Sequence, residues 1–266
     1  MTLNHQALAL AVTLSAGLVA GCGSNEGEVT EPSFTGTMLS TAPTAEKKEA
    51  EKQAKANAKV PLSSYVMISP DEDQVILTKL LIAKSGDLFS EDETLSFLSA
   101  QYYNERDAFK KKDIAKALLP EFNTELKVLA NMSYLAVPIE KVAYQEKGRS
   151  AFHMEPLRVQ TYNFDLGGFP LASRYGAKDC WDSSFQNNQR ISVSISGPDA
   201  PCFLPVNDEA QARSIETALQ SNNLRVQGTA YMHLTARSRN LYGQVLRAKI
   251  ELTHEITKER LGAFDL

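Results

Sequence analysis

The sequence predicts an α+β fold in which helices come first and a mainly antiparallel sheet follows. Between residues 70 and 131, apolar residues recur every three to four positions, which is the period of an amphipathic helix. From Tyr134 onward the period changes to two, which is typical of strands with one buried face. The segment 208–219 returns to the helical period and is expected to pack across one face of the sheet.

Three or four helices are expected in the first part of the chain. Two capping boxes, Ser69–Glu72 and Ser90–Glu93, mark helix starts, because the serine and glutamate side chains each accept a hydrogen bond from a backbone N–H that the helix leaves unpaired. Pro120 is expected to break the last helix, since proline has no backbone N–H and its ring clashes with the preceding turn. The run Lys110–Lys112 is flanked by acidic residues and is expected to lie on a solvated helix face.

Five strands are expected in the second part, at 139–145, 157–166, 191–196, 225–235 and 244–255. The last two alternate most clearly, and the polar segment 236–243 between them is expected to close a hairpin. Their inward-facing residues are predicted to be Val226, Gly228, Ala230, Met232, Leu234, Leu246, Ala248, Ile250 and Leu252. The opposite face is expected to meet water or a partner. Residues 167–190 contain Gly, Pro and Asn clusters and are expected to form a long irregular loop.

The N-terminal residues predict an export signal. Residues 7–20 are apolar and uncharged, and a run of this kind that closes on small residues is typical of a secretory signal. The tetrapeptide Val19-Ala20-Gly21-Cys22 resembles the lipobox of bacterial lipoproteins, which implies that residues 1–21 are a signal peptide and that Cys22 carries a lipid (palmitate) anchor. Residues 22–59 are rich in small, polar and helix-forming residues, and 45–59 has no large apolar residue to bury, so they are expected to form a flexible, partly helical tether.

The remaining chain, 60–266, is expected to be a single domain with a helical part at 60–133 and a β-rich part at 134–266. This layout is similar to uncharacterised lipoprotein domain families of Gram-negative bacteria. The resemblance implies a cell-envelope protein that is attached to the membrane through the lipid on Cys22. In such lipoproteins the residue after the cysteine influences sorting, and Gly23 resembles the outer-membrane class, with the domain facing the periplasm.

Charge and cysteine content limit the classes of partner and site. The net charge is −4 and the isoelectric point is near 5.7, which argues against nucleic acid as a partner, because phosphate binding needs a basic surface. In an exported protein the pair Cys180 and Cys202 predicts a disulfide. The alternatives are two free buried thiols or two ligands of a metal site. No Cys-x-x-Cys or His-x-x-x-His spacing accompanies the pair, so neither a metal nor a cofactor is predicted.

Catalytic signatures are weak. The chain contains no Gly-x-Ser-x-Gly, His-Glu-x-x-His or phosphate-binding loop, and its histidines are expected at the surface. Asp179 and Asp182 flank Trp181, so either the carboxylates act as an acid and base or they are solvated loop residues. The tryptophan either stacks on a ligand or covers the disulfide.

A possible binding surface is predicted instead. Arg and Tyr recur at binding hot spots, and several such residues fall on the outward strand face or near the hairpin tip. The candidates are Trp181, Tyr231, His233, Arg237, Arg239 and Tyr242. These patterns favour a non-catalytic domain that binds an envelope protein or polymer. The alternatives are an envelope hydrolase with a dispersed site at Trp181, Asp182 and His233, or a carrier of a small apolar ligand.

Overall fold

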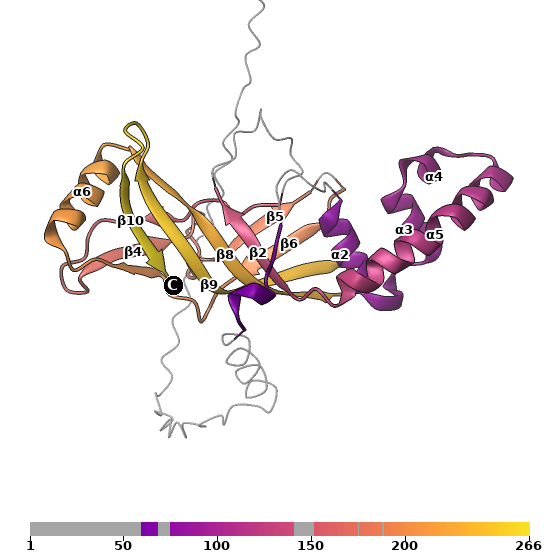
Figure 1. The fold of residues 1–266 in the computed structure, drawn as a ribbon, viewed down its shortest axis with the longest axis horizontal. Helices are drawn as coiled ribbons and strands as arrows, with labels where there is room; N and C mark the ends of the chain where they lie inside the picture. Colours follow the sequence, from indigo (N-terminus) through magenta and orange to yellow (C-terminus); the bar gives the residue numbers. More distant parts are fainter. Residues whose placement is uncertain (1–59, 69–74, 141–151, 175, 188) are drawn as a thin grey trace, which may run out of the picture. The chain divides into compact units, whose positions relative to one another are not determined.

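The computed structural model describes residues 60–68, 75–140, 152–174, 176–187 and 189–266. All of these residues belong to one compact unit. The signal peptide, Cys22, the tether at 22–59 and the capping box Ser69–Glu72 lie outside the described residues. Within the described residues the fold class is α+β, as predicted, with five α-helices, a seven-stranded sheet and a separate three-stranded sheet (Figure 1).

Most helices precede most strands. The helices are α2 (Ile76–Lys84), α3 (Glu91–Leu98), α4 (Ala100–Asn104), α5 (Ala108–Ala130) and α6 (Glu209–Gln220), with 3-10 turns η1 (Leu62–Ser64) and η2 (Gly86–Leu88). The strands are β1 (Val66–Met67), β2 (Tyr134–Ile139), β3 (Arg158–Val159), β4 (Gly168–Ala172), β5 (Ser183–Gln186), β6 (Ser192–Ser196), β7 (Phe203–Pro205), β8 (Leu224–Arg237), β9 (Asn240–His254) and β10 (Arg260–Asp265).

The large sheet has the strand order β1-β2-β8-β9-β6-β5, and β10 also pairs with β9. One edge of the long strand β9 pairs with two strands, because its first half pairs with β6 and its second half pairs with β10. Most pairs are antiparallel, as expected, but β1–β2 and β6–β9 are parallel. The small sheet, β3-β4-β7, is antiparallel throughout.

The predicted hairpin of β8 and β9 is present, but its turn is shorter than expected. The strands run to Arg237 and restart at Asn240, so the turn is Ser238–Arg239 rather than 236–243. Ser238 has a φ of 55°, the left-handed conformation that two-residue hairpin turns need. The tip is therefore a tight turn rather than a loop.

A β-bulge in this hairpin changes which residues of β9 face the core, so the predicted inward face is partly wrong. Tyr231 pairs with Arg247 while Met232 pairs with Val245, so β9 has an extra residue at 246. Leu246 is consequently only partly buried, and Val245 is the residue that points into the core. The remaining alternation in β8 follows the prediction, with Ala230 and Met232 among the buried residues.

Helix α5 is continuous through Pro120, contrary to the predicted break. Proline removes one hydrogen bond, but the neighbouring Ala, Leu and Glu residues are strong helix formers and carry the helix past it. The side-chain hydroxyl of Thr124 donates to the Pro120 carbonyl at 2.8 Å. Leu129 is the single buried residue of this helix, so α5 packs lightly against its neighbours.

Three other segments differ from expectation. The predicted strand 157–166 shrinks to β3, and the predicted loop 167–190 contains β4 and β5. The strand expected at 139–145 begins earlier, as β2, while residues 141–151 lie outside the described residues. The strand expected at 191–196 is present as β6. Strand β4 forms despite its Gly and Pro because β3 and β7 pair with it from distant parts of the sequence.

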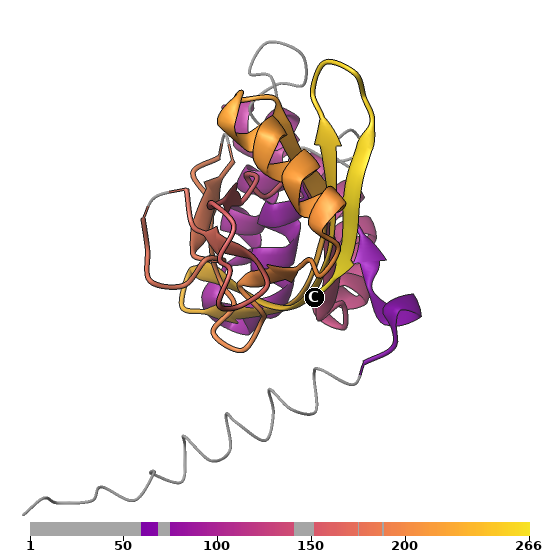
Figure 2. The same cartoon turned by 90° about the vertical axis from the view of Figure 1, so that its left-hand side faces the viewer.

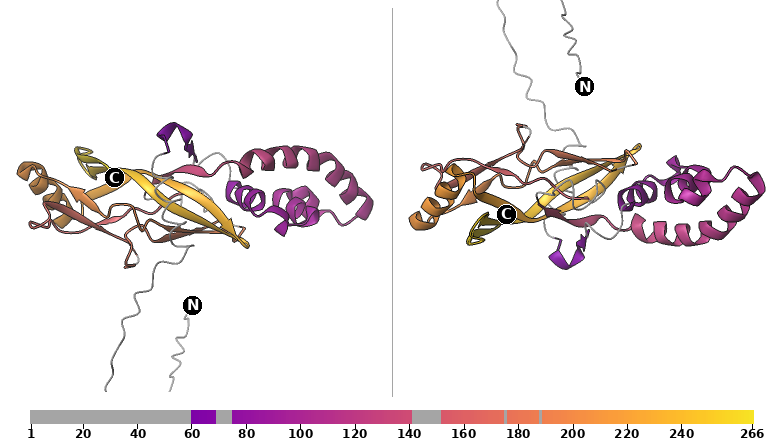
Figure 3. Two further views of the ribbon diagram at one scale, coloured as in Figure 1. Left: turned by 90° about the horizontal axis from the view of Figure 1, so that it is seen from below. Right: turned by 90° about the horizontal axis from the view of Figure 1, so that it is seen from above.

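The core lies between the inner face of the large sheet, the small sheet, α2 and α6. Its members include Leu77 and Leu80 from α2, Phe169 from β4, and Ile215 from α6. As predicted, α6 packs across the sheet, where it contacts β8 and β10 (Figure 2). Helix α2 contacts both β8 and α5, so it joins the sheet to the other helices (Figure 3).

Candidate functional site

Trp181 is a core residue and does not belong to a binding surface. Its side chain is 0% exposed, and the indole N–H donates to the Pro201 carbonyl at 3.2 Å. Gly197 lies directly against the ring. Because the ring is covered on all sides, it cannot stack on a ligand, and this part of the predicted surface is wrong.

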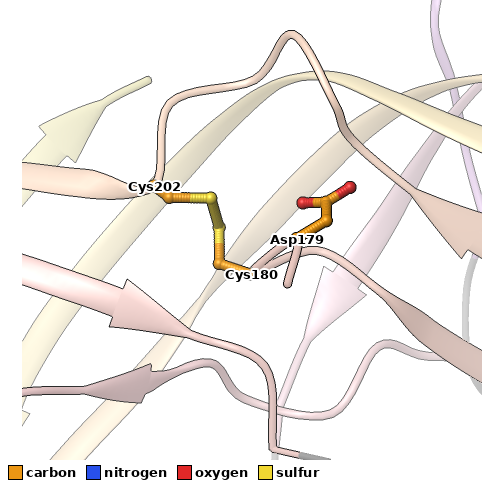
Figure 4. Close-up of side chains that lie close together, drawn as sticks. All are labelled: Asp179, Cys180 and Cys202. Carbon is orange, nitrogen blue, oxygen red and sulfur yellow. A yellow bond between two sulfur atoms is a disulfide. The ribbon is translucent and has the colours of Figure 1, made fainter. Parts of the chain in front are cut away.

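Cys180 and Cys202 form the predicted disulfide, with sulfur atoms 2.05 Å apart (Figure 4). The Asp179 carboxylate lies within 4.8 Å of both sulfurs. It accepts hydrogen bonds from the backbone N–H of Trp181 at 2.9 Å and of Gly197 at 2.7 Å. Disulfide sulfurs are not thiolates, and the carboxylate is already occupied, so these three residues organise the loop and do not offer a metal site.

Asp182 lacks the space that catalysis needs. Burial, and then the negative charge of Asp179, raises the pKa of its carboxyl group. The hollow beside it, which Glu155 and Arg174 also line, has a volume of only 10 Å³ and is too small for a substrate. His233 lies on β8, with β9 and β6 between it and the start of β5 after Asp182, which separates them by roughly 14 Å. The three residues of the proposed hydrolase site are therefore not brought together.

The outer face of β2 and β8 is partly covered by the chain itself. The start of the described segment lies against part of it, because the Arg247 guanidinium donates to the Val60 carbonyl at 2.6 Å, while β1 extends the sheet beside β2. The Tyr65 ring lies 5.5 Å from that of Tyr134 and 5.2 Å from that of Tyr231, measured between ring centroids. Tyr231 is thus part of internal packing, and the expectation that this face meets water or a partner is wrong here.

His233 belongs to the same cluster. Its ring centroid lies 5.2 Å from that of Tyr134, the residue opposite it in the register of β2 and β8. Burial, and then the nearby positive charge of Lys84, lowers the pKa of the imidazole. Lys84 reaches this region from α2 and donates to the Ser133 hydroxyl at 3.3 Å. The histidine is therefore held in its neutral form beneath a junction of helix and sheet.

Arg239 connects the hairpin tip to η2 and α3. Its guanidinium donates to the Glu93 carboxylate at 2.8 Å and to the Leu88 carbonyl at 3.1 Å, and it lies 4.7 Å from the centroid of the Phe89 ring. The backbone N–H of Ser90, and then Arg239, lowers the pKa of Glu93. This arginine therefore has partners within the chain, while its side chain is still 54% exposed.

Arg237 and Tyr242 remain at the surface. Both side chains are exposed, and the guanidinium lies 5.9 Å from the centroid of the Tyr242 ring. With Arg239, whose side chain is 54% exposed, they are the part of the predicted binding surface that stays open to solvent. They line none of the hollows described here.

The largest of the three hollows described here runs along α6, in a region where the sequence analysis placed no site. It has a volume of 1110 Å³. The residues around it are Tyr162, Phe164, Asn207, Glu209, Ala212, Arg213, Glu216, Thr217, Gln220 and Ser221. We call this hollow the α6 groove. A second hollow of 450 Å³ shares Gln220 with it, so the helix is flanked by open space on two sides.

The aromatic wall of the α6 groove comes from the segment between β3 and β4. The Tyr162 backbone N–H donates to the Glu216 carboxylate at 3.0 Å, and its hydroxyl donates to the Val206 carbonyl at 3.0 Å. Tyr162 is therefore firmly placed. The Phe164 ring packs edge-on against it at 5.1 Å and is 89% exposed. An exposed phenylalanine held beside a groove is a feature of binding surfaces.

The polar residues of the groove interact mainly within α6. Arg213 pairs with Glu209, and Gln220 donates to Glu216 at 2.7 Å. The hydroxyls of Thr217 and Ser221 donate to helix carbonyls one turn earlier. This lining contains no histidine or cysteine, and its hydroxyls are bound to the backbone, so it lacks an activated nucleophile.

The sequence carried a partial signal for this groove. A strand at 157–166 would have placed Tyr162 and Phe164 on one face, but nothing indicated that this face meets α6. None of the helices in the described ranges is both long and apolar enough to cross a membrane. Comparisons with known protein families, curated proteins and solved structures found no match to this chain.

Proposed function

We propose that this chain is a lipid-anchored envelope protein whose domain binds an extended segment of another envelope protein in the α6 groove, without catalysis. The observation that carries the proposal is the groove itself, which combines a volume of 1110 Å³ with the exposed ring of Phe164. Pockets for small ligands measure about 300–1,000 Å³, so this hollow is at least as large as they are, and its course along α6 favours an extended occupant.

The composition of the groove favours a protein partner. Tyr, Phe and Arg are enriched where proteins bind one another, and Tyr162, Phe164 and Arg213 line the groove together. The surrounding amide and carboxylate groups can pair with the backbone of an extended peptide. An envelope glycan is the alternative polymer, and the experiment below separates the two.

The anchor is supported by the N-terminal sequence. The lipobox-like residues Val19–Cys22 favour lipidation at Cys22, and Gly23 favours the outer membrane with the domain in the periplasm. Arg247 holds the Val60 carbonyl, so the proposed tether would leave the folded domain at the outer face of the sheet.

The other candidate functions have less support. A carrier of an apolar ligand needs an enclosed apolar cavity, whereas the α6 groove is open and has charged residues along α6. A hydrolase at Trp181, Asp182 and His233 is disfavoured because the first residue is fully buried and the other two lie apart.

The test places a photo-crosslinking amino acid at position 164 of the full-length, lipidated protein in intact envelopes. We expect crosslinks to one protein species, and Arg213→Glu should reduce their yield by changing the charge of the groove. A probe at Ile256, which is exposed in the β9–β10 turn, is the matched control. Crosslinks to glycan would show that the partner is an envelope polymer and not a protein. Equal labelling from positions 164 and 256 would refute binding in the groove.

The anchor is tested separately with Cys22→Ser. We expect this variant to remain unprocessed or to become soluble in the periplasm. Normal processing with continued membrane association would contradict the proposed lipidation.

A further inference from the structure

The end of the helical part, where α4 meets α5, carries a surface of aromatic and basic residues. Figures 1 and 3 show this segment as the part of helices α3–α5 farthest from the sheet. We call it the arm tip and define it by Tyr103, Arg106, Phe109, Lys110, Lys112 and Lys116. It lines none of the hollows described above.

Two aromatic side chains of the arm tip are open to solvent. Tyr103 is 70% exposed and Phe109 is 83% exposed. Phe109 is held there by the helix cap, because the Asp107 carboxylate accepts a hydrogen bond from its backbone N–H at 2.9 Å. Neither ring packs against another aromatic ring in the described part of the chain. Large apolar groups that stay exposed together indicate an interaction surface.

The charge of this segment is opposite to that of the whole chain. Residues 99–116 contain five Lys or Arg and three Asp or Glu, a net charge of +2, whereas the chain carries −4. Of the five cations, Lys111 is paired, at 3.2 Å from Asp92. The other four, all members of the arm tip, form no ion pair within the described residues.

The neighbouring acids do little to neutralise these cations. The Glu105 carboxylate accepts hydrogen bonds from the backbone N–H groups of Arg106 and Asp107, and that of Asp107 accepts them from Phe109 and Lys110. Both carboxylates are thus directed toward the backbone at the start of α5. The cations remain free to meet an anionic surface.

We propose that the arm tip docks on the surface of an anionic lipid bilayer. Aromatic rings favour the headgroup region, and lysine and arginine reach lipid phosphates while their alkyl stems stay in contact with apolar groups. Charge complementarity favours this occupant, since a basic end on an acidic protein orients that end toward a negative surface. The contact is separate from the α6 groove and from any lipid on Cys22.

The test uses the mature chain, residues 22–266, with Cys22→Ser, so that neither an acyl chain nor the apolar residues 7–20 contribute, and sedimentation with vesicles. The vesicles are phosphatidylglycerol with phosphatidylethanolamine, compared with phosphatidylcholine alone. We expect binding to the anionic vesicles that weakens as salt increases. The double variant Lys110→Gln, Lys112→Gln should bind about 25-fold more weakly, at about fivefold per charge, and Phe109→Ser should bind on the order of tenfold more weakly.

Controls come from the other end of the same helix. Lys127→Gln and Val128→Ser change an exposed cation and an exposed apolar residue of α5, and both should bind like the parent. Absence of binding to anionic vesicles, or equal losses in the control variants, would overturn the proposal. These results would leave the groove proposal unaffected, because a different surface is involved.

A second readout reports insertion directly. Phe109→Trp places a tryptophan at the arm tip, while Trp181 is buried and should not respond to vesicles. We expect its emission to shift to shorter wavelength when anionic vesicles are added. An unchanged spectrum at saturating lipid would exclude insertion of this side chain.

Discussion

Substitution of Gly197 by alanine tests whether Trp181 is a rigid core residue. A Cβ atom at position 197 would lie 2.7, 2.8 and 2.9 Å from the Cδ1, Cγ and Cβ atoms of Trp181. The ring cannot retreat, because it is fully buried and its N–H is bound to the Pro201 carbonyl. Overpacking of this kind costs about 1–3 kcal/mol. The substitution should therefore destabilise the domain without removing any hydrogen bond.

The assay is urea unfolding followed by fluorescence, which reports this site because Trp181 is the only tryptophan. With a slope of about 2 kcal/mol per molar urea, the midpoint of Gly197→Ala should fall by about 0.5–1.5 M. Ser194→Ala, on an exposed position of β6, should leave the midpoint unchanged. A wild-type midpoint for Gly197→Ala, or free access of acrylamide to Trp181 in the native protein, would refute the assignment of this ring to the core.

Three further predictions concern pH, the disulfide and the hairpin tip. Burial and Lys84 lower the pKa of His233 in the folded protein. The contribution of this histidine to stability is therefore complete above about pH 6.5 and is lost as the pH falls through the folded pKa. Thermal unfolding of His233→Gln should depend less on pH in this range. Replacing Cys180 and Cys202 with alanine opens a loop of 23 residues and should lower the free energy of unfolding by roughly 3 kcal/mol in chemical denaturation. Arg239→Ala should speed hydrogen exchange around η2 and α3, with a global loss within about 1 kcal/mol.

Each of these predictions has a contradicting outcome. The same pH dependence in His233→Gln and wild type would mean that other groups control acid destabilisation. An unchanged unfolding free energy in the double alanine variant would mean that the disulfide does not constrain the unfolded chain. Unchanged exchange in Arg239→Ala, with Arg237→Ala as the exposed control, would show that the contacts of Arg239 do not hold α3.

Local signals predicted the starts of α3 and α6, because a cap involves only neighbouring residues. The capping box at Ser90 is present, with the Glu93 N–H donating to the serine hydroxyl at 3.2 Å and the Ser90 N–H donating to the glutamate at 3.0 Å. Asp208, the first residue of the predicted segment 208–219, caps α6, and its carboxylate accepts a hydrogen bond from the Gln211 N–H at 2.7 Å. Alternation also identified β8 and β9, because one face of each strand is buried.

Features that depend on distant partners were not predictable. The bulge opposite Tyr231 changes the phase of β9, and no local pattern distinguishes Val245 from Leu246. Strand β4 exists through pairing with β3 and β7, so its Gly and Pro residues indicated a loop. The break expected at Pro120 did not occur, because the helix on both sides outweighs one lost hydrogen bond.

For the candidate site, too, local features were predictable and features that depend on distant residues were not. Trp181, Tyr231 and Arg239 were chosen for their chemistry, yet the first two are packed inside the domain or against Tyr65 and the third binds the helices. The sequence correctly placed Tyr231 on the outward face of its strand and Arg239 near the hairpin tip. The sequence did not show whether these side chains are accessible, because accessibility depends on which residues cover them.

The sequence alone determined that helices precede a sheet, which two cysteines pair, and that the N-terminus is lipobox-like, since these can be read from periodicity, cysteine number and a short motif. Only the tertiary structure decided which surfaces remain open. It brought the Tyr162–Phe164 segment beside α6 to form the groove, and it left the basic, aromatic end of α5 without a cover. Exposure is set by contacts between residues that are far apart in the chain, and such contacts leave no spacing pattern to read.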